Sequence, residues 1–166
     1  EIDFRLGEGL CTLHEGEANG AVVAGMGGIL TRDILENSLD IVKEMDFLLL
    51  QPAQNPEMLR KYLYEGPFEI LDEDIIKEER RFYEYILVRY NENPLVKRKN
   101  IGEYQVGECL LNRRGELLNE FLESKISETE AILRKMDLSS ENARFRKVKL
   151  ENIIKEFKGI EKWRNK

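Results

Sequence analysis

Residues 21–30 read AVVAGMGGIL, and this stretch constrains the fold more than any other part of the chain. Its first four residues are small or β-branched, which predicts a strand buried on both faces, the kind found inside parallel sheets. The strand ends in Gly-Met-Gly-Gly, and glycine at a strand end lets the backbone approach a ligand closely. Ligands of open α/β sheets sit beyond the carboxyl ends of the strands. The turn is therefore a candidate binding site, although a tight strand-to-helix turn would also use the pair Gly27 and Gly28.

Strands and helices alternate along the first 92 residues. Apolar runs predict strands at 2–6, 22–24 and 47–50, and helical spacing predicts helices at 29–37 and about 55–65. This order is typical of a doubly wound parallel sheet.

The pattern changes after residue 67. Residues 68–71 and 82–90 are both strand-like and no helix separates them, which predicts an antiparallel hairpin at the sheet edge. We expect a Rossmann-like α/β domain over residues 1–92, closed by Asn91-Glu-Asn-Pro94.

Residues 93–166 are predicted to form a helical hairpin, coiled-coil-like in character. The first helix carries a heptad-like seam of Leu118, Leu122, Ile126, Thr129, Leu133 and Met136. Ser139 or Ser140 is a candidate N-cap for the second helix. The apolar side expected for that helix consists of Phe145, Val148, Ile153, Phe157 and Ile160.

Composition limits the class of protein. The chain is 42% apolar and 35% charged, and no apolar run approaches the roughly 20 residues that cross a bilayer, so we expect a cytoplasmic protein without a membrane partner. Cys11 and Cys109 are far apart in the sequence and have no metal-ligand spacing, so they indicate thiols in a reduced compartment. The net charge of −6 is uneven: 9 basic and 19 acidic residues precede Asn91, and 17 basic and 13 acidic residues follow from it. Two units with different partners are indicated.

The chain lacks the usual catalytic motifs. It has no G-x-S-x-G sequence, no Walker loop and no paired histidines, and the single histidine, His14, lies in an acidic loop where a surface position is expected. A reaction that depends mainly on positioning suits such a site. Methyl transfer from a sulfonium is of this kind, because the leaving group departs neutral.

Four segments carry a resemblance to a known family. DFRLGEGL, VVAGMGGIL, LLLQPAQNPEMLRKYL and DEDIIKEERRFYEYILV resemble, in this order and spacing, the bacterial TrmK family. Its members are S-adenosylmethionine-dependent methyltransferases that modify N1 of a D-arm adenine, number 22, in tRNA. The resemblance covers residues 2–90 closely and the helical hairpin more loosely. It implies a class I methyltransferase sheet, S-adenosylmethionine as cofactor and tRNA as partner.

The resemblance also assigns site residues. Those implied for the cofactor pocket are Gly7, Glu8, Gly9, Leu10, Ala24 and Gly25, with Glu8 departing from the Asn or Asp usual in the family. Those implied for the methyl-transfer site are Gly25, Met26, Gly27, Gly28, Gln51 and Pro52. Gln51 has an alternative role as a strand-end residue that bonds to backbone. No metal ligand is implied.

Two family features have no match in this chain. These are a D-x-G-S-D-H-like loop after a first strand, and a second strand that ends in an acidic residue. We therefore expect a partial sheet that lacks its first two strands, a C-terminal portion of a methyltransferase that is inactive alone.

Basic clusters are candidates for tRNA contact, because RNA binding needs phosphate neutralisation. They are Lys97, Arg98 and Lys99 near the junction, and Arg144, Arg146, Lys147 and Lys149 in the second long helix. A charged helix face that is simply solvated is the alternative. Adenine N1 lies on the Watson–Crick edge, so the acceptor base must be unpaired and flipped.

Three other functions stay open at this stage. The chain could belong to a methyltransferase for another RNA or a small molecule, or to a dinucleotide-dependent oxidoreductase. It could also be a non-catalytic helical module that dimerises through its seam.

Overall fold

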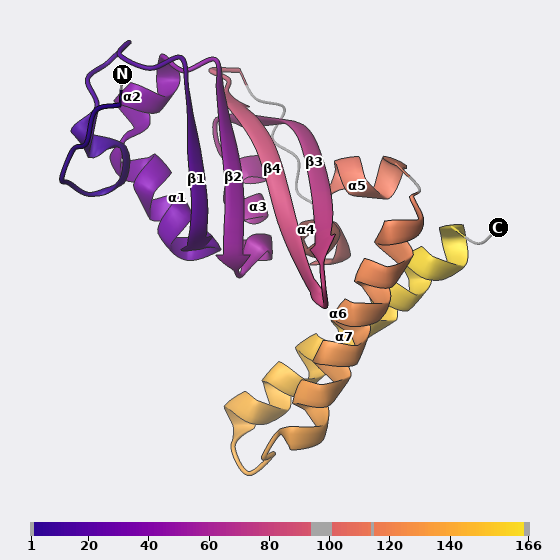
Figure 1. Ribbon diagram of the computed structural model, residues 1–166. Coiled ribbons are helices and arrows are strands. Elements are labelled where there is room, and N and C mark those ends of the chain that lie inside the picture. The colour runs from indigo at the N-terminus through magenta and orange to yellow at the C-terminus, as the bar shows by residue number, and fades with distance from the viewer. Residues whose placement is uncertain (1, 94–100, 114, 165–166) are drawn as a thin grey trace.

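The computed structural model describes residues 2–93, 101–113 and 115–164, and in these ranges a mixed sheet joins a pair of long helices (Figure 1). The elements are a 3₁₀ helix Gly9–Thr12, β1 Gly20–Gly27, α1 Gly28–Asn37, α2 Leu39–Lys43, β2 Phe47–Gln54, α3 Pro56–Glu65, β3 Phe68–Glu78, β4 Arg81–Tyr90, α4 Ile101–Val106, α5 Glu108–Arg113, α6 Glu116–Lys135 and α7 Glu141–Arg164.

The sheet has the strand order β1-β2-β4-β3. β1 and β2 are parallel, whereas β4 runs antiparallel to both of its neighbours, β2 and β3. The predicted alternation of β1, α1, β2 and α3 is confirmed, as is the closing antiparallel hairpin. Because β1 and β2 are parallel, their carboxyl ends meet at one edge of the sheet, the lower edge in Figure 1.

Two strand predictions are wrong. Residues 2–6 form no strand, and Ile2, Phe4 and Leu6 are exposed, since no strand in the described ranges lies beside them to pair with their backbone. β1 is not buried on both faces either. Val23 is buried but Val22 is 65% exposed, because successive side chains of a strand point to opposite faces, and helices α1 and α3 cover only the face of Val23.

The hairpin strands are longer than expected. β3 continues through the charged segment to Glu78, beyond the predicted end at residue 71, and pairs with β4 along almost its whole length. Glu79, at the turn, has a left-handed φ of 53°. The ends of β3 and β4 thus project past the rest of the sheet towards α6 (Figure 1).

The first core lies between the sheet and helices α1 and α3. Its fully buried side chains include Leu48, Leu50 and Ile86 from the strands, with Leu35 and Leu59 from the helices. Helical spacing in α1 and α3 places these residues on the face that meets the sheet, which is the arrangement that period 3.6 predicts.

The second core lies among α4–α7. The predicted seam of α6 is buried at Leu118, Leu122 and Ile126, where it packs with Ile153 and Phe157 of α7. The apolar seam of α6 is therefore buried against α7 of the same chain. Whether copies of the chain associate stays a prediction.

The start of α7 is partly as predicted. Ser140 is the N-cap, because its Oγ accepts a hydrogen bond of 3.1 Å from the Ala143 N–H. Phe145 and Val148, however, are 77% and 55% exposed. For Val148 the reason is the five-residue step to Ile153: at about 100° per residue the two side chains point about 140° apart, so Val148 faces away from the buried residues.

Ile75 of β3 is a member of the second core, and Phe82 of β4 packs against it. The helices are therefore continuous with the projecting hairpin, and the division into units 1–92 and 93–166 stays a prediction. Within the described ranges, the chain has no helix that could span a bilayer.

Candidate functional site

The pairing of β1 with β2 is interrupted at Gly25. Ala24 pairs with Gln51 and Met26 pairs with Pro52, which leaves Gly25 out of register. Gly25 has a φ of 77°, a left-handed conformation that glycine adopts without strain. Its N–H donates a 2.9 Å hydrogen bond to Oε1 of Gln51. The alternative role of Gln51, bonding to backbone at a strand end, is thus confirmed.

The glycine pair after Gly25 has two different uses. A Cβ on Gly27, the N-cap of α1, would meet nothing within 4 Å. A Cβ on Gly28 would lie 2.3 Å from the carbonyl oxygen of Asn55, so Gly28 allows α1 to pack against the turn that follows β2. The tight-turn interpretation therefore holds for Gly28, whereas Gly27 leaves space open.

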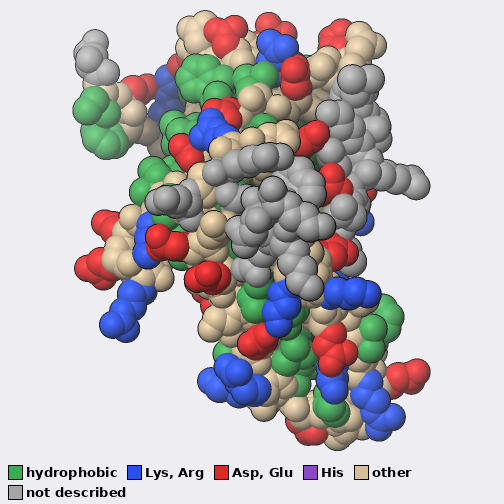
Figure 2. Space-filling model, turned by 90° about the vertical axis from the view of Figure 1, so that its right-hand side faces the viewer, with side chains coloured by type: hydrophobic (Ala, Val, Ile, Leu, Met, Phe, Trp, Pro, Cys, Tyr) green, Lys and Arg blue, Asp and Glu red, His purple; other side chains and the backbone are tan. Residues whose placement is uncertain are grey.

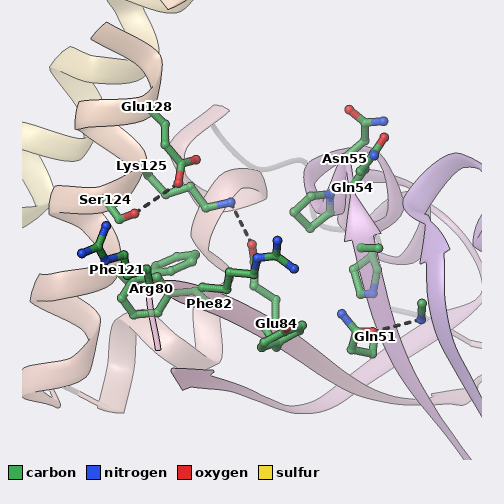
Figure 3. Close-up of a pocket in the computed structure, with 16 residues that line it drawn as sticks. Gln51, Gln54, Asn55, Arg80, Phe82, Glu84, Phe121, Ser124, Lys125 and Glu128 are labelled. Atoms are coloured by element: carbon green, nitrogen blue, oxygen red, sulfur yellow. Dashed lines mark hydrogen bonds and ion pairs between the residues drawn. The ribbon is translucent and has the colours of Figure 1, made fainter. Parts of the chain in front are cut away.

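A cavity of about 500 Å³ opens at this edge of the sheet. It lies between the carboxyl ends of β1 and β2, the β3–β4 turn and one side of α6 (Figure 3). Its lining comprises Gly25, Gln51, Pro52, Ala53, Gln54, Asn55, Pro56, Arg80, Arg81, Phe82, Tyr83, Glu84, Phe121, Ser124, Lys125 and Glu128.

Three of the six residues predicted for the methyl-transfer site line this cavity: Gly25, Gln51 and Pro52. Ala24 and Met26 are exposed beside it on β1. The cavity wall is mixed in character, since amides of β2 and its following turn face aromatic and charged side chains of β4 and α6. This mixture suits a ligand that is flat, partly apolar and rich in hydrogen-bonding groups.

A buried ion network lies between α3 and the two strands that project past the sheet. The guanidinium of Arg60, fully buried, is 2.6 Å from Oε1 of Glu73 through Nε and 2.8 Å from Oε2 of Glu84 through Nη1. Nη1 also donates to the carbonyl oxygens of Tyr104 (3.3 Å) and Gln105 (3.2 Å) in α4. Burial disfavours the charge of Arg60, but attraction by the two carboxylates outweighs it and raises the Arg60 pKa.

The network continues to the cavity through Glu84. Its Oε1 is 2.9 Å from Nζ of Lys125, a residue of α6. Burial favours the neutral form of Glu84, yet Arg60 and Lys125 attract the charged form more strongly and lower the Glu84 pKa. One carboxylate thus joins α3, β4 and α6 at the cavity wall.

The RLGEGL loop lies away from this cavity. Gly7 and Glu8 are exposed, Gly9 lies against Ile34 of α1, and Leu10 is buried in the first core. None of these four residues lines the cavity, and the structure does not bring them to Gly25. Their role in holding a cofactor stays a prediction.

Other predicted residues lie on the surface. His14 is exposed, as predicted. Arg144, Arg146 and Lys149 are exposed on α7, and Lys147 is half-buried with Nζ 3.7 Å from Glu151. Lys and Arg side chains gather over the lower, helical end of the molecule (Figure 2). Lys97, Arg98 and Lys99 lie outside the described residues.

The sequence did not predict the cavity wall formed by the β3–β4 turn, β4 and α6. Arg80 and Arg81 were visible as a charged pair between two strands, which is the one signal that could have placed them at a turn. Lys125 and Glu84 gave no signal, because only the fold brings α6 against β4.

An α/β sheet with this strand order, and with a cavity at the carboxyl ends of its parallel strands, places the chain in the class of Rossmann-like proteins, whose ligands bind at that edge. The sequence model of the TrmK family, described as tRNA (adenine(22)-N(1))-methyltransferase, matches residues 1–159, so the chain belongs to that family. The resemblance stated from the sequence is confirmed.

Three relatives illustrate the similarity. The tRNA (adenine(22)-N(1))-methyltransferase of Bacillus subtilis (strain 168) is 36% identical over 86 residues, which are 52% of this chain and 36% of that protein. A Streptococcus agalactiae protein of the NADB-Rossmann superfamily is 29% identical with a TM-score of 0.81, over 96% of this chain and 67% of that one. A Streptococcus pneumoniae putative tRNA (m1A22) methyltransferase, solved with S-adenosyl-L-methionine, shares the fold at 24% identity and a TM-score of 0.77.

The coverage of the last structure is 94% of this chain and 66% of that one. This chain therefore spans about two thirds of the solved relatives, and its matched segment spans about a third of the curated one.

Proposed function

We propose that this chain is part of an S-adenosylmethionine-dependent enzyme that methylates N1 of an adenine in tRNA. The observation that carries the proposal is the cavity at the carboxyl ends of β1 and β2, where backbone without side chains faces aromatic and cationic groups. Family membership supports the reaction type, and the names of the relatives support S-adenosylmethionine and tRNA.

The residues present fit the reactive end of the cofactor. The space where a Cβ would stand is open at both Gly25 and Gly27, so the methyl group and its sulfur can approach the backbone there. When bound, S-adenosylmethionine supplies a methyl group on a sulfur that leaves as a neutral thioether, so a ring nitrogen with a free lone pair needs no strong base. Positioning then supplies most of the rate.

The acceptor would enter from the side of β4 and α6. A cavity of about 500 Å³ is in the range of small-ligand pockets and is large enough for one flipped base. The side-chain amides of Gln54 and Asn55 are the candidates for hydrogen bonds to the adenine edge, and Phe82 and Tyr83 supply flat apolar surface beside it.

We also infer that the sheet of the active enzyme continues beyond β1. Two observations support this extension: β1 lies at the edge of the sheet and pairs only with β2 in the described ranges, and the solved relatives are longer chains. The added strands would carry the remaining cofactor contacts, to which Gly7, Glu8, Gly9 and Leu10 would contribute.

The helical hairpin is proposed as an RNA-binding, coiled-coil-like unit of a cytoplasmic enzyme. Exposed basic residues on α7 support contact with phosphates. Reversing the charges of Arg146 and Lys147 together should weaken tRNA binding and flatten its salt dependence. Unchanged binding would leave the hairpin a structural role only.

The test of the reaction is a methylation assay with the protein that contains this chain. Transcribed tRNA is incubated with labelled S-adenosylmethionine, and 1-methyladenosine is quantified by mass spectrometry. A tRNA in which the acceptor adenine is replaced by guanine is the substrate control.

Gly27→Val is the informative variant, because the structure leaves room for its side chain and the fold should tolerate it. Gly27 does not line the cavity but lies two residues after Gly25, and its side chain would enter the open space beside it, where the methyl group and sulfur are proposed to approach; we therefore expect loss of at least about tenfold in kcat/KM. Gly159→Val on α7, where space is also open, is the matched control and should keep activity. Absence of methylation by the wild-type protein, or full activity of Gly27→Val, would overturn the proposal.

A further inference from the structure

We propose that Lys125, together with Arg80 and Arg81, binds the backbone phosphate of the nucleotide whose base enters the cavity. This inference rests on the proposed function and extends it, because it assigns one wall of the acceptor site to α6. The long helical hairpin would then complete the site as well as bind RNA elsewhere.

Lys125 lies at the cavity wall, and its ammonium group has N–H donors available for a ligand. Its Nζ is 2.9 Å from Oε1 of Glu84 and 5.0 Å from the ring centroid of Phe121. An ammonium group carries three N–H donors, and within the described residues Glu84 is the only hydrogen-bond acceptor for this one. The side chain stays 25% exposed, so the remaining donors can reach a ligand.

The ammonium group of Lys125 is held in position by buried groups on its protein side. Glu84 is buried, and its second oxygen is 2.8 Å from the guanidinium of Arg60, which is itself fully enclosed. Rotating the carboxylate outward with the lysine would separate it from this buried guanidinium. A cation held in advance loses little conformational entropy when a phosphate binds, and this preorganisation favours affinity.

Two further cations reach the same opening from the β3–β4 turn. Arg80 and Arg81 line the cavity and are exposed, and neither has an ion-pair partner among the described residues. The anions of the lining are Glu84, already shared by two cations, and Glu128, which accepts a 3.2 Å hydrogen bond from Ser124. The lining as a whole thus carries three cations, Lys125, Arg80 and Arg81, against these two carboxylates.

The arrangement fits a nucleotide better than a simple anion. Figure 3 shows Lys125 and Arg80 on one side of the cavity and Gln51 on the opposite side, beside the strand ends. A nucleotide has its anionic phosphate at one end and its flat base at the other, so it can contact both sides at once. Charge-assisted hydrogen bonds to phosphate are strong, and arginine matches phosphate geometry especially well.

The test compares Lys125→Met with Lys77→Met in the protein that contains this chain. Lys77 is a matched control: it also joins the sheet to α6 through an ion pair, with Glu120, and lies 5.7 Å from the ring centroid of Phe82, but it does not line the cavity. Binding of tRNA and methylation are measured over a series of salt concentrations, and thermal unfolding is followed for each variant.

We expect Lys125→Met to raise KM for tRNA by about tenfold, the loss of one charged hydrogen bond. The slope of log affinity against log salt should fall by about 0.7 to 0.9, the value for one phosphate contact. Lys125→Arg should restore most of the affinity, and Arg80→Ala/Arg81→Ala should lower it further. Lys77→Met should leave both quantities unchanged.

The outcomes separate the two proposals. If the wild-type protein methylates tRNA and Lys125→Met matches Lys77→Met in KM and salt slope, the phosphate site is wrong and the proposed function stands. If the wild-type protein does not methylate tRNA, the proposed function itself fails. A Lys125→Met variant that loses affinity only in proportion to lost folding, with Lys125→Arg no better, would also overturn the phosphate site.

Discussion

Replacing Arg60 by methionine should destabilise the protein more than most single changes. The guanidinium is fully buried and contacts two carboxylates that are themselves nearly inaccessible, Glu73 and Glu84. Methionine fills much of the volume but cannot donate a hydrogen bond. The two carboxylates would then face each other with Lys125 as the nearby cation.

The magnitude follows from that geometry. Breaking a buried ion pair by removing one partner costs about 3–5 kcal/mol, because an uncompensated charge stays buried. For a chain of this size each kcal/mol lowers Tm by about 2–4 °C, so Tm should fall by about 6–20 °C.

Urea unfolding followed by circular dichroism measures the loss directly. The control is the triple variant Arg60→Met/Glu73→Gln/Glu84→Gln, which removes the unpaired charges and should recover much of the stability. The reasoning is refuted if Arg60→Met costs less than about 1 kcal/mol, or if the triple variant is no more stable than the single one.

Three smaller effects can be checked on the same protein. Gly28→Ala should cost about 1–3 kcal/mol in thermal unfolding, because its Cβ would lie 2.3 Å from the Asn55 carbonyl oxygen; an unchanged Tm would contradict this. Burial, with nearby carboxylates, raises the pKa of Cys109 to about 11, so at pH 7.5 iodoacetamide should label the exposed Cys11 well before Cys109, as peptide mass spectrometry would show. The pKa of Glu84 is lower in the folded state, so its stabilisation should be lost as pH falls through that value, and Glu84→Gln should flatten the acid limb of the stability profile.

Much of the fold could be predicted from sequence because the relevant signals are local. Apolar runs and helical spacing placed β1, α1, β2 and α3, and α3 ends at Glu65, where the sequence predicts its end. The seam of α6 was visible for the same reason, since its period of three and four residues defines one buried face.

The errors arose where pairing or packing partners decide the outcome. Residues 2–6 have the composition of a strand, but a strand forms only beside another strand. Phe145 and Val148 are as apolar as the buried residues of α7 and are nevertheless exposed; for Val148, the five-residue step to Ile153 turns the side chain to solvent. The strand predicted at residues 68–71 was too short, because the later residues of β3 are charged and face solvent or form ion pairs. Composition alone cannot distinguish such a strand from a loop.

The candidate site was predicted only on its glycine side. Gly25, Gln51 and Pro52 are adjacent to strand ends, where sequence position indicates spatial position. Arg80, Glu84 and Lys125 complete the cavity from distant parts of the chain, and no pattern links them before the fold is known.

The contacts of Arg60 with α4, and of Glu84 with α6, attach these helices to the sheet through buried charged groups. A rotation of the helices relative to the sheet would have to break these contacts. The position of α6 relative to the cavity is thereby fixed. At about 1.5 Å per residue, its last turn at Lys135 stands some 15 Å beyond Lys125. An RNA that reached both the cavity and the far end of the helix would have to present two features at that spacing, so molecular shape would select the substrate before any base is read.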